Sequence, residues 1–398
     1  MMQDTKAVTD SRRVAFVLPH LGSGGAERST LALACGLLKR GYCVDILHLY
    51  DWVAYKDEVP PEARVLVLAH EPLSSERAFQ LPSKLGFKTR LALRRRHLVH
   101  AQWVADYLDN RKPDVLFSSL DCAKIASLLA IQCSNHKPPL SLIVRCDIRS
   151  DKRRYRRLYQ RLFPLADHVV GVSRGVTAGV VRDLGIPKSR VSTIYNPVVT
   201  RELFDKAKTT PSHPWFSTNG PRIILAAGRL ASAKDYPTLL RAFAIASKSR
   251  PLRLVILGSG PLRGRLERLV RRLGLSENVS MPGWEPNPFA LMSRASLFAH
   301  ASRYEGLCGV LIQAMACGCP CVSTDCLSGC DEILDHGRLG PLVPVGDHEA
   351  LAAAMLRVLN APPDKAALRA QAMKFSSENS IAGYELLISR LTEKRTIA

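Results

Sequence analysis

Residues 14–49 have the sequence VAFVLPHLGSGGAERSTLALACGLLKRGYCVDILHL, which decides the fold of the first half of the chain. A short apolar run at 14–18 leads into a proline and a glycine-rich stretch. Apolar residues then recur at helical spacing from 27 to 40, and a second apolar run follows at 44–49. This periodicity predicts a strand, a glycine loop, a helix and a second strand. Together they form a βαβ unit, from which parallel sheets are built.

The same alternation continues on both sides of a break in the pattern. Further strands are predicted at 65–68, 115–118, 142–144 and 168–172, and a polar, proline-containing stretch at 196–221 is typical of a linker. A second series of strands is predicted at 222–227, 253–257, 296–299 and 320–324. We therefore expect an α/β protein of two Rossmann-like, doubly wound parallel-sheet domains, 1–198 and 199–375, facing a central cleft. A helix within 376–398 is expected to cross back to the first domain.

The composition is that of a folded globular protein, with 46% hydrophobic and 23% charged residues in a chain of 398. No run of 18 apolar residues occurs and residues 1–13 are polar, so we expect no membrane span, no secretory signal and a cytoplasmic location. Six of the 11 cysteines lie between 308 and 330 without the paired spacing of a zinc site. We expect them to be small buried residues, and we expect no bound metal.

The formal charge of +21 is unevenly distributed, because residues 1–200 contain 31 Lys and Arg against 18 Asp and Glu. Arginines gather at 90–96, and a denser basic cluster lies between Arg145 and Arg161. Such clusters attract nucleic acid, anionic lipid or phosphorylated substrates, and a solvated helix face is the plain alternative. Since no nucleic-acid-binding motif accompanies them, we expect an anionic membrane surface as partner, with peripheral attachment and no nucleic acid.

Three segments have the composition of an anion or sugar site. The loop 22–25 places backbone amides at the start of a helix, where they can meet an anion, although a tight turn alone also explains its glycines. Arg229 and Lys234 follow a predicted strand and can neutralise a leaving diphosphate as its charge develops. Glu305 precedes a glycine-rich turn and an apolar helix, so its carboxylate can accept sugar hydroxyls, and Gln313 offers an amide further along that helix.

These segments resemble glycosyltransferase family 4, and the resemblance runs from Val14 to about Ile388. It is carried by HLGSGGAER at 20–28, by Gly228-Arg229 with Lys234, and by EGLCGVLIQAMACGCP at 305–320, which resembles the Glu-x7-Glu signature. The third motif is the strongest. The resemblance implies the GT-B fold, with an acceptor-side first domain and a nucleotide-sugar-binding second domain.

The resemblance also implies roles for individual residues. Gly24 and Gly25 would approach the donor phosphates and the acceptor, while Arg229 and Lys234 would hold the diphosphate. Glu305 and the amides of Leu307, Cys308 and Gly309 would hold the donor sugar, and Gly228, Gly258 and Gly283 complete the expected donor site. Gln313 departs from the family pattern, which has a glutamate that binds the ribose at this position. The substitution of Gln for Glu is therefore expected to affect the affinity for the donor. Asp147, which follows a predicted strand, is a further catalytic candidate near the acceptor hydroxyl, with a helix cap or salt bridge as the alternative.

The function implied is that of a retaining glycosyltransferase without a cofactor. The donor is a nucleotide-diphosphate sugar, with a UDP-sugar favoured and GDP-mannose as the other choice, and the acceptor is a lipid-linked glycan, a polysaccharide or a lipopolysaccharide. Two alternatives stay open. One is a nucleotide-sugar epimerase or sugar-phosphate synthase on the same fold. The other is a non-catalytic, membrane-associated glycan-binding relative, an alternative supported by Gln313 at the position of the family's second Glu.

Overall fold

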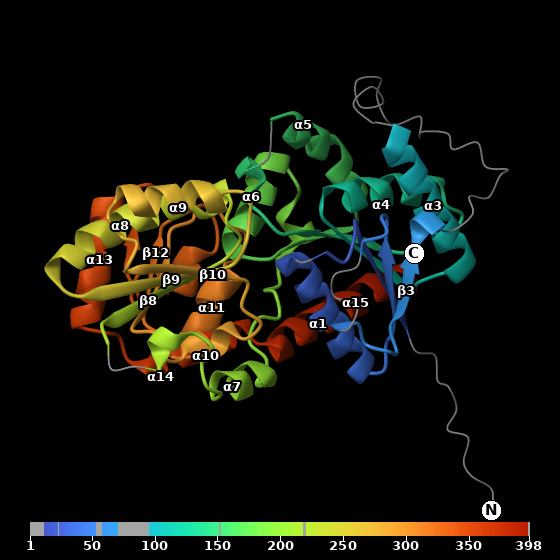
Figure 1. The fold of residues 1–398 in the computed structure, drawn as a ribbon. Helices are drawn as coiled ribbons and strands as arrows, with labels where there is room; N and C mark the ends of the chain where they lie inside the picture. The colour runs from blue at the N-terminus through green and yellow to red at the C-terminus, as the bar shows by residue number, and fades with distance from the viewer. Residues whose placement is uncertain are drawn as a thin grey trace, which may run out of the picture. The chain divides into compact units, whose positions relative to one another are not determined.

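The structure is a computed structural model that describes residues 12–396 except 23, 53–57, 71–94, 151–152 and 218–219. Its contacts divide the chain into two compact units, each built around one parallel sheet (Figure 1). The first unit takes the described residues of 1–172, 177–194 and 380–398, and the second takes those of 173–176 and 195–379. The end of the chain thus belongs to the first unit.

The first unit contains a seven-stranded parallel sheet in the order β3-β2-β1-β4-β5-β6-β7. Its strands are β1 (Arg13–Leu18), β2 (Cys43–His48), β3 (Arg64–Val67), β4 (Val115–Ser119), β5 (Leu140–Val144), β6 (His168–Gly171) and β7 (Val191–Thr193). The chain runs outward from β1 to β3 and then returns to β4 to run outward in the opposite direction. The carboxyl ends of β1 and β4 therefore form a topological switch point, where sheets of this kind bind ligands.

The described helices of the first unit cover both faces of this sheet (Figure 1). They are α1 (Gly25–Lys39), α3 (Arg95–Arg111), α4 (Asp121–Cys133), α5 (Arg153–Leu162), α6 (Arg174–Leu184), whose first residues belong to the second unit, and α15 (Ser377–Thr396). The last helix, α15, packs on the first unit, with the ring centroids of Tyr384 and Phe117 at 5.3 Å. Gly36 of α1 permits this approach, because a Cβ there would lie 2.1 Å from Ile381.

The second unit contains a six-stranded parallel sheet in the order β10-β9-β8-β11-β12-β13. Its strands are β8 (Arg222–Ala227), β9 (Leu252–Leu257), β10 (Val279–Gly283), β11 (Leu297–His300), β12 (Cys321–Thr324) and β13 (Leu342–Val343). By the same rule the switch point lies between the carboxyl ends of β8 and β11.

The α-helices of the second unit lie on both faces of its sheet, with α8, α9 and α13 on one face and α10 and α11 on the other (Figure 1). They are α7 (Arg201–Ala207), α8 (Tyr236–Ser249), α9 (Arg263–Arg272), α10 (Pro288–Met292), α11 (Gly309–Ala316), α12 (Cys330–Ile333), α13 (His348–Asn360) and α14 (Lys365–Ala372). Short 3-10 turns occur at η2 (Leu68–His70), η3 (Ile148–Ser150), η4 (Phe163–Leu165), η5 (Lys188–Arg190), η6 (Pro214–Phe216), η7 (Ser232–Lys234) and η8 (Met373–Phe375).

The predicted strands are confirmed with shifts of one or two residues at their ends, but the predicted linker at 196–221 is partly wrong. It contains α7, which packs against α10 as part of the second unit. Thr200 caps this helix by accepting a hydrogen bond from the backbone of Leu203, whose side chain is buried. The six clustered cysteines are all buried, as expected of small core residues. None of the described helices is long and apolar enough to cross a membrane.

Candidate active site

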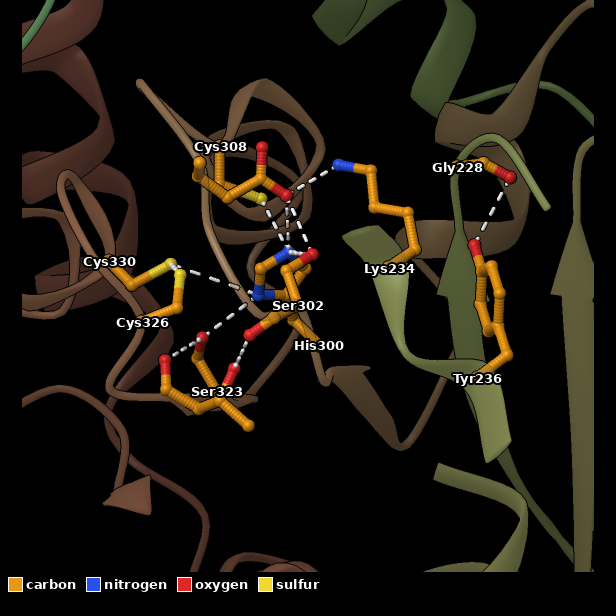
Figure 2. A network of polar contacts seen from close by, with 11 residues as sticks. Gly228, Lys234, Tyr236, His300, Ser302, Cys308, Ser323, Cys326 and Cys330 are labelled. Atoms are coloured by element: carbon orange, nitrogen blue, oxygen red, sulfur yellow. Dashed lines mark hydrogen bonds and ion pairs between the residues drawn. The ribbon is translucent and has the colours of Figure 1, made fainter. Parts of the chain in front are cut away.

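A charged network lies at the switch point of the second sheet and joins two residues that the sequence singled out. Glu305 Oε1 accepts hydrogen bonds from Lys234 Nζ at 2.5 Å and from Ser302 Oγ at 2.7 Å. His300 Nε2 lies 3.1 Å from the same oxygen. Figure 2 shows Lys234, His300 and Ser302 converging from different segments of the chain.

Strand order explains this convergence. Lys234 ends η7, which follows β8, whereas His300 is the last residue of β11, the neighbouring strand. His300 Nδ1 lies 3.0 Å from Ser323 Oγ on β12, and Thr324 Oγ1 donates to the Ser302 carbonyl at 2.7 Å (Figure 2). The ends of three strands are therefore connected by side chains, which fixes the geometry of the site.

The electrostatics of the network keep its groups charged at neutral pH. Burial raises the pKa of Glu305, but the charge of Lys234 and the contacts from His300 outweigh it and hold that pKa well below its usual range. Burial likewise opposes the charge on Lys234, and Glu305 reverses this to raise the lysine pKa. For His300, burial is outweighed by its contacts with Cys308 and Glu305, which raise the pKa to about 9. A carboxylate thus lies between two cations.

Two groups of this site are open to a ligand. The side-chain contacts of Glu305 all involve Oε1, so within the described part of the chain Oε2 has no protein partner. Arg229 follows β8, is exposed, and forms no ion pair or side-chain hydrogen bond with any described residue. The site therefore offers an acceptor oxygen and a free guanidinium.

Three predicted glycines lie at the ends of adjacent strands. Gly228, Gly258 and Gly283 follow or end β8, β9 and β10, all with positive φ. Gly258 donates its N–H to the Gly283 carbonyl at 2.6 Å, and a Cβ on Gly258 would lie 2.2 Å from the Gly228 carbonyl oxygen. This close backbone approach excludes a side chain at Gly258, and the positive φ of all three glycines disfavours one at Gly228 and Gly283.

The motif around 305–318 forms a turn and then α11, as predicted. Gly309 begins the helix and Cys308 is its N-cap, so the first amides of α11 have no partner in the preceding helical turn. Leu307 is buried beside them. Gln313 is half-buried on the same helix, and the structure does not test its contact with a ribose.

One group of side chains has the composition of a metal site. His300, Glu305 and Cys308 each offer a ligand atom within 4.8 Å of the others. However, the Lys234 ammonium already contacts the carboxylate, and burial raises the pKa of the Cys308 thiol well above its ordinary value. These residues are arranged as a hydrogen-bond network, and the absence of a metal stays a prediction.

The glycine loop lies in the first unit, after β1. Gly24 is the N-cap of α1 and Gly25 is its first residue, and a Cβ on Gly24 would lie 2.3 Å from Glu27 Oε2. Glu27 is buried and its other oxygen lies 3.4 Å from His20 Nδ1. The loop is therefore held by its own motif residues, and its role toward donor and acceptor stays a prediction.

Two members of the predicted basic cluster, Arg145 and Arg149, have hydrogen-bond partners inside the first unit. Arg145 is partly buried and donates to Ser119 Oγ at 2.7 Å and to Thr30 Oγ1 at 3.0 Å. Arg149 donates to both carboxylate oxygens of Asp147 at 3.1 Å. Lys152, Arg90 and Arg94 lie outside the described residues, whereas Arg95 and Arg96 begin α3.

Asp147 is completely buried and also accepts from the Arg149 backbone N–H at 2.8 Å. These contacts fit the salt-bridge alternative. Asp147 is thus shielded from solvent in this arrangement, and its role near the acceptor hydroxyl stays a prediction that the mechanism proposed below does not need.

The sequence did not single out His300 and Ser302, although both contact Glu305. A signal was present, because polar residues directly after a buried strand, in Ala299-His300-Ala301-Ser302, mark the carboxyl edge of a parallel sheet. The pairing of Lys234 with Glu305 could not be read from spacing, since the two residues are 71 positions apart.

Comparison with known proteins agrees with this geometry. Residues 23–202 match the family model described as Glycosyltransferase Family 4, and residues 210–375 match the model described as glycosyl transferases group 1. A 4-alpha-N-acetylgalactosaminyltransferase of Campylobacter jejuni, named for N-acetylgalactosamine-N,N'-diacetylbacillosaminyl-diphospho-undecaprenol, is 27% identical over 85% of this chain and 88% of its own length.

Solved structures share the fold at low sequence identity. A glycosyltransferase from Rickettsia africae superimposes with a TM-score of 0.76 and 19% identity, over 96% of this chain and 99% of that chain. An Anabaena protein crystallised with UDP and glucose gives a TM-score of 0.74 and 19% identity, over 95% of this chain and all of that chain. The fold is GT-B, and the two family models, one matching each half of the chain, support a glycosyltransferase of the family 4 type.

Proposed function

We propose that this glycosyltransferase uses a nucleoside-diphosphate sugar as donor, retains the anomeric configuration, and transfers the sugar to a lipid-linked or lipopolysaccharide-type glycan. The observation that carries the donor assignment is the site at the ends of β8 and β11. There an unpaired guanidinium, Arg229, follows one strand, and a carboxylate with one open oxygen, Glu305, follows the other.

Each group has a role in this proposal. Arg229, the amino end of α11 and Lys234 stabilise the diphosphate, whose negative charge grows as the bond from the anomeric carbon to the phosphate oxygen breaks. Glu305 Oε2 accepts a hydrogen bond from a hydroxyl of the donor sugar, while Oε1 keeps its hydrogen bonds from Lys234 and Ser302. The acceptor oxygen forms the new bond on the face that the diphosphate leaves, and its proton goes to a phosphate oxygen of the leaving group. No protein base is required for this route, which fits the buried state of Asp147.

A UDP-sugar is favoured over GDP-mannose because an Anabaena neighbour of the same fold was crystallised with UDP and glucose. The acceptor class is supported by the Campylobacter relative, whose name specifies an undecaprenol-linked glycan. We place the acceptor on the first unit and the donor on the second, and we propose attachment to the cytoplasmic face of a membrane through the basic surface of the first unit.

A panel assay tests this function. The purified chain is incubated with UDP-glucose, UDP-N-acetylglucosamine, UDP-N-acetylgalactosamine or GDP-mannose, with and without a bacterial lipid extract as acceptor. We expect release of the nucleoside diphosphate with one donor, faster when the extract is present, and a product whose anomeric proton coupling in NMR equals that of the donor sugar. A product of opposite configuration contradicts retention, and equal rates with and without extract contradict a lipid-linked acceptor.

A further inference from the structure

We propose that an aromatic patch on the first unit, formed by His20, Tyr50 and Trp52, binds a neutral sugar ring of the acceptor. The inference rests on the proposed transfer function and names the chemical group that the first unit recognises. None of these three residues belongs to the charged network of the second unit.

The backbone holds the patch at the carboxyl edge of the first sheet. Tyr50 donates its N–H to the Pro19 carbonyl at 2.9 Å, and Leu21 donates its N–H to the Trp52 carbonyl at 3.1 Å. The segments after β1 and β2 therefore remain paired beyond the ends of the strands. This pairing fixes the aromatic side chains beside the switch point between β1 and β4.

The rings of the patch lie against the glycine loop. The ring centroids of His20 and Trp52 are 4.6 Å apart, and a Cβ on Gly22 would lie 3.3 Å from the Trp52 ring. Tyr50 packs edge-on against the His100 ring at 5.0 Å. Even so, Trp52 is 56% exposed and Tyr50 is 37% exposed. Aromatic area left in water in a fixed arrangement is typical of a binding surface.

The charge around the patch distinguishes a sugar from a phosphate group. Burial lowers the pKa of His48 and of His100, which adjoins the patch, so both imidazoles are uncharged at neutral pH. Arg28, on the helix after the glycine loop, is paired with Glu58 at 3.1 Å. A phosphate needs free cations, whereas the C–H face of a pyranose ring packs on an aromatic face and its hydroxyls need only neutral hydrogen-bonding groups. The rings of the patch therefore fit the sugar ring of the acceptor, and the exposed Arg96, whose charge acts on Tyr50 and His100, is the cation beside them.

The experiment compares wild type with Trp52→Ala, Trp52→Phe and a matched control, Leu386→Ala, which truncates a 74% exposed side chain elsewhere on the first unit. The acceptor probes are methyl and octyl glycosides of glucose, galactose and N-acetylgalactosamine, and the donor is the one identified by the panel. For each variant we measure the KM of the acceptor, acceptor-free hydrolysis of the donor and the melting temperature.

We expect Trp52→Ala to raise the acceptor KM about tenfold or more for methyl and octyl glycosides alike, with donor hydrolysis and melting temperature as in wild type. Trp52→Phe keeps an aromatic ring, so its acceptor KM should stay within about threefold of the wild-type value. The acceptor KM of Leu386→Ala should equal that of wild type. An unchanged acceptor KM in Trp52→Ala overturns the inference, and an effect confined to octyl glycosides overturns it by assigning the patch to the lipid chain. Failure of wild type to hydrolyse or transfer any donor would contradict the proposed function itself, and this inference with it.

Discussion

The two sheets have the same doubly wound topology, but their switch points carry different chemistry. In the second unit, the segments after β8 and β11 carry Arg229, Lys234 and Glu305. Arg229 is exposed, and the hydrogen-bonded Lys234 and Glu305 are half-buried. In the first unit, the edge carries a glycine loop and aromatic rings, while Arg145 and Asp147 make their contacts inside the unit. The fold provides two equivalent ligand edges, and under our proposals their side chains fit one edge to an anionic donor and the other to a neutral sugar.

The largest effect is expected from Lys234→Ala. This change removes a cation from the proposed diphosphate site and also removes the ion-pair partner of the buried Glu305 carboxylate. We expect turnover to fall by about 100-fold or more and the melting temperature to fall as well, because the largely buried carboxylate loses one of its two cationic partners. Steady-state kinetics and calorimetry check both effects. Near-normal turnover would show that Lys234 takes no part in binding the leaving diphosphate.

Arg229→Ala should lower turnover by a similar factor, about 100-fold, without changing the melting temperature. The reason is that Arg229 is exposed and makes no side-chain contact with the described residues, so its loss leaves the fold intact. The same two measurements apply. A parallel loss of stability would show that Arg229 has a structural role, and normal kinetics would exclude it from donor binding.

Gln313→Glu should act on binding and not on chemistry. A carboxylate restores the two-pronged contact to ribose hydroxyls that the family pattern has, with a gain of about 1–2 kcal/mol. We expect the KM of the donor to fall about five- to thirtyfold with little change in kcat, because this contact is the same in ground and transition states. A rise in the donor KM would mean that position 313 does not face the ribose.

The charged network predicts a dependence of stability on pH. The pKa of His300 is raised from its ordinary value of 6.5 to about 9 in the folded protein. Its contribution to the free energy of unfolding is therefore fully present below about pH 6.5 and is lost as the pH rises through about 9. Wild type should exceed His300→Gln in melting temperature by more at pH 6 than at pH 10. An equal margin at both pH values would mean that the imidazole is uncharged.

No effect on turnover is expected when Arg156 and Arg157 are both replaced by Gln. If the basic surface of the first unit binds lipid headgroups, this variant should bind anionic liposomes more weakly at moderate salt while hydrolysing the donor at the wild-type rate. Equal liposome binding would leave these arginines as a solvated helix face. Arg149 is left out because it is bound to Asp147.

The sequence was sufficient for most of the fold because apolar runs and glycines recur with the period of a βαβ unit. It failed at α7, where a polar and proline-containing stretch hid a short capped helix that packs on α10. In that segment a tertiary contact, and not local periodicity, stabilises the helix.

The site was predicted in part for a similar reason. Lys234 and Glu305 could be identified from their motifs, but their direct contact depends on β8 and β11 being neighbours, which only the strand order determines. Asp147 shows the opposite case, since its position after a strand suggested chemistry while its burial with Arg149 depends on three-dimensional packing. Charge in a sequence does not reveal which charges are already neutralised inside the fold.

The central claim is that the charged edge of the second unit binds the diphosphate of the donor. Isothermal titration of UDP into wild type, Arg229→Ala and the matched control Arg241→Ala, an exposed arginine within α8, tests it most directly. We expect UDP to bind wild type and Arg241→Ala equally and to bind Arg229→Ala at least about tenfold more weakly. Equal affinity of all three proteins for UDP would contradict the claim.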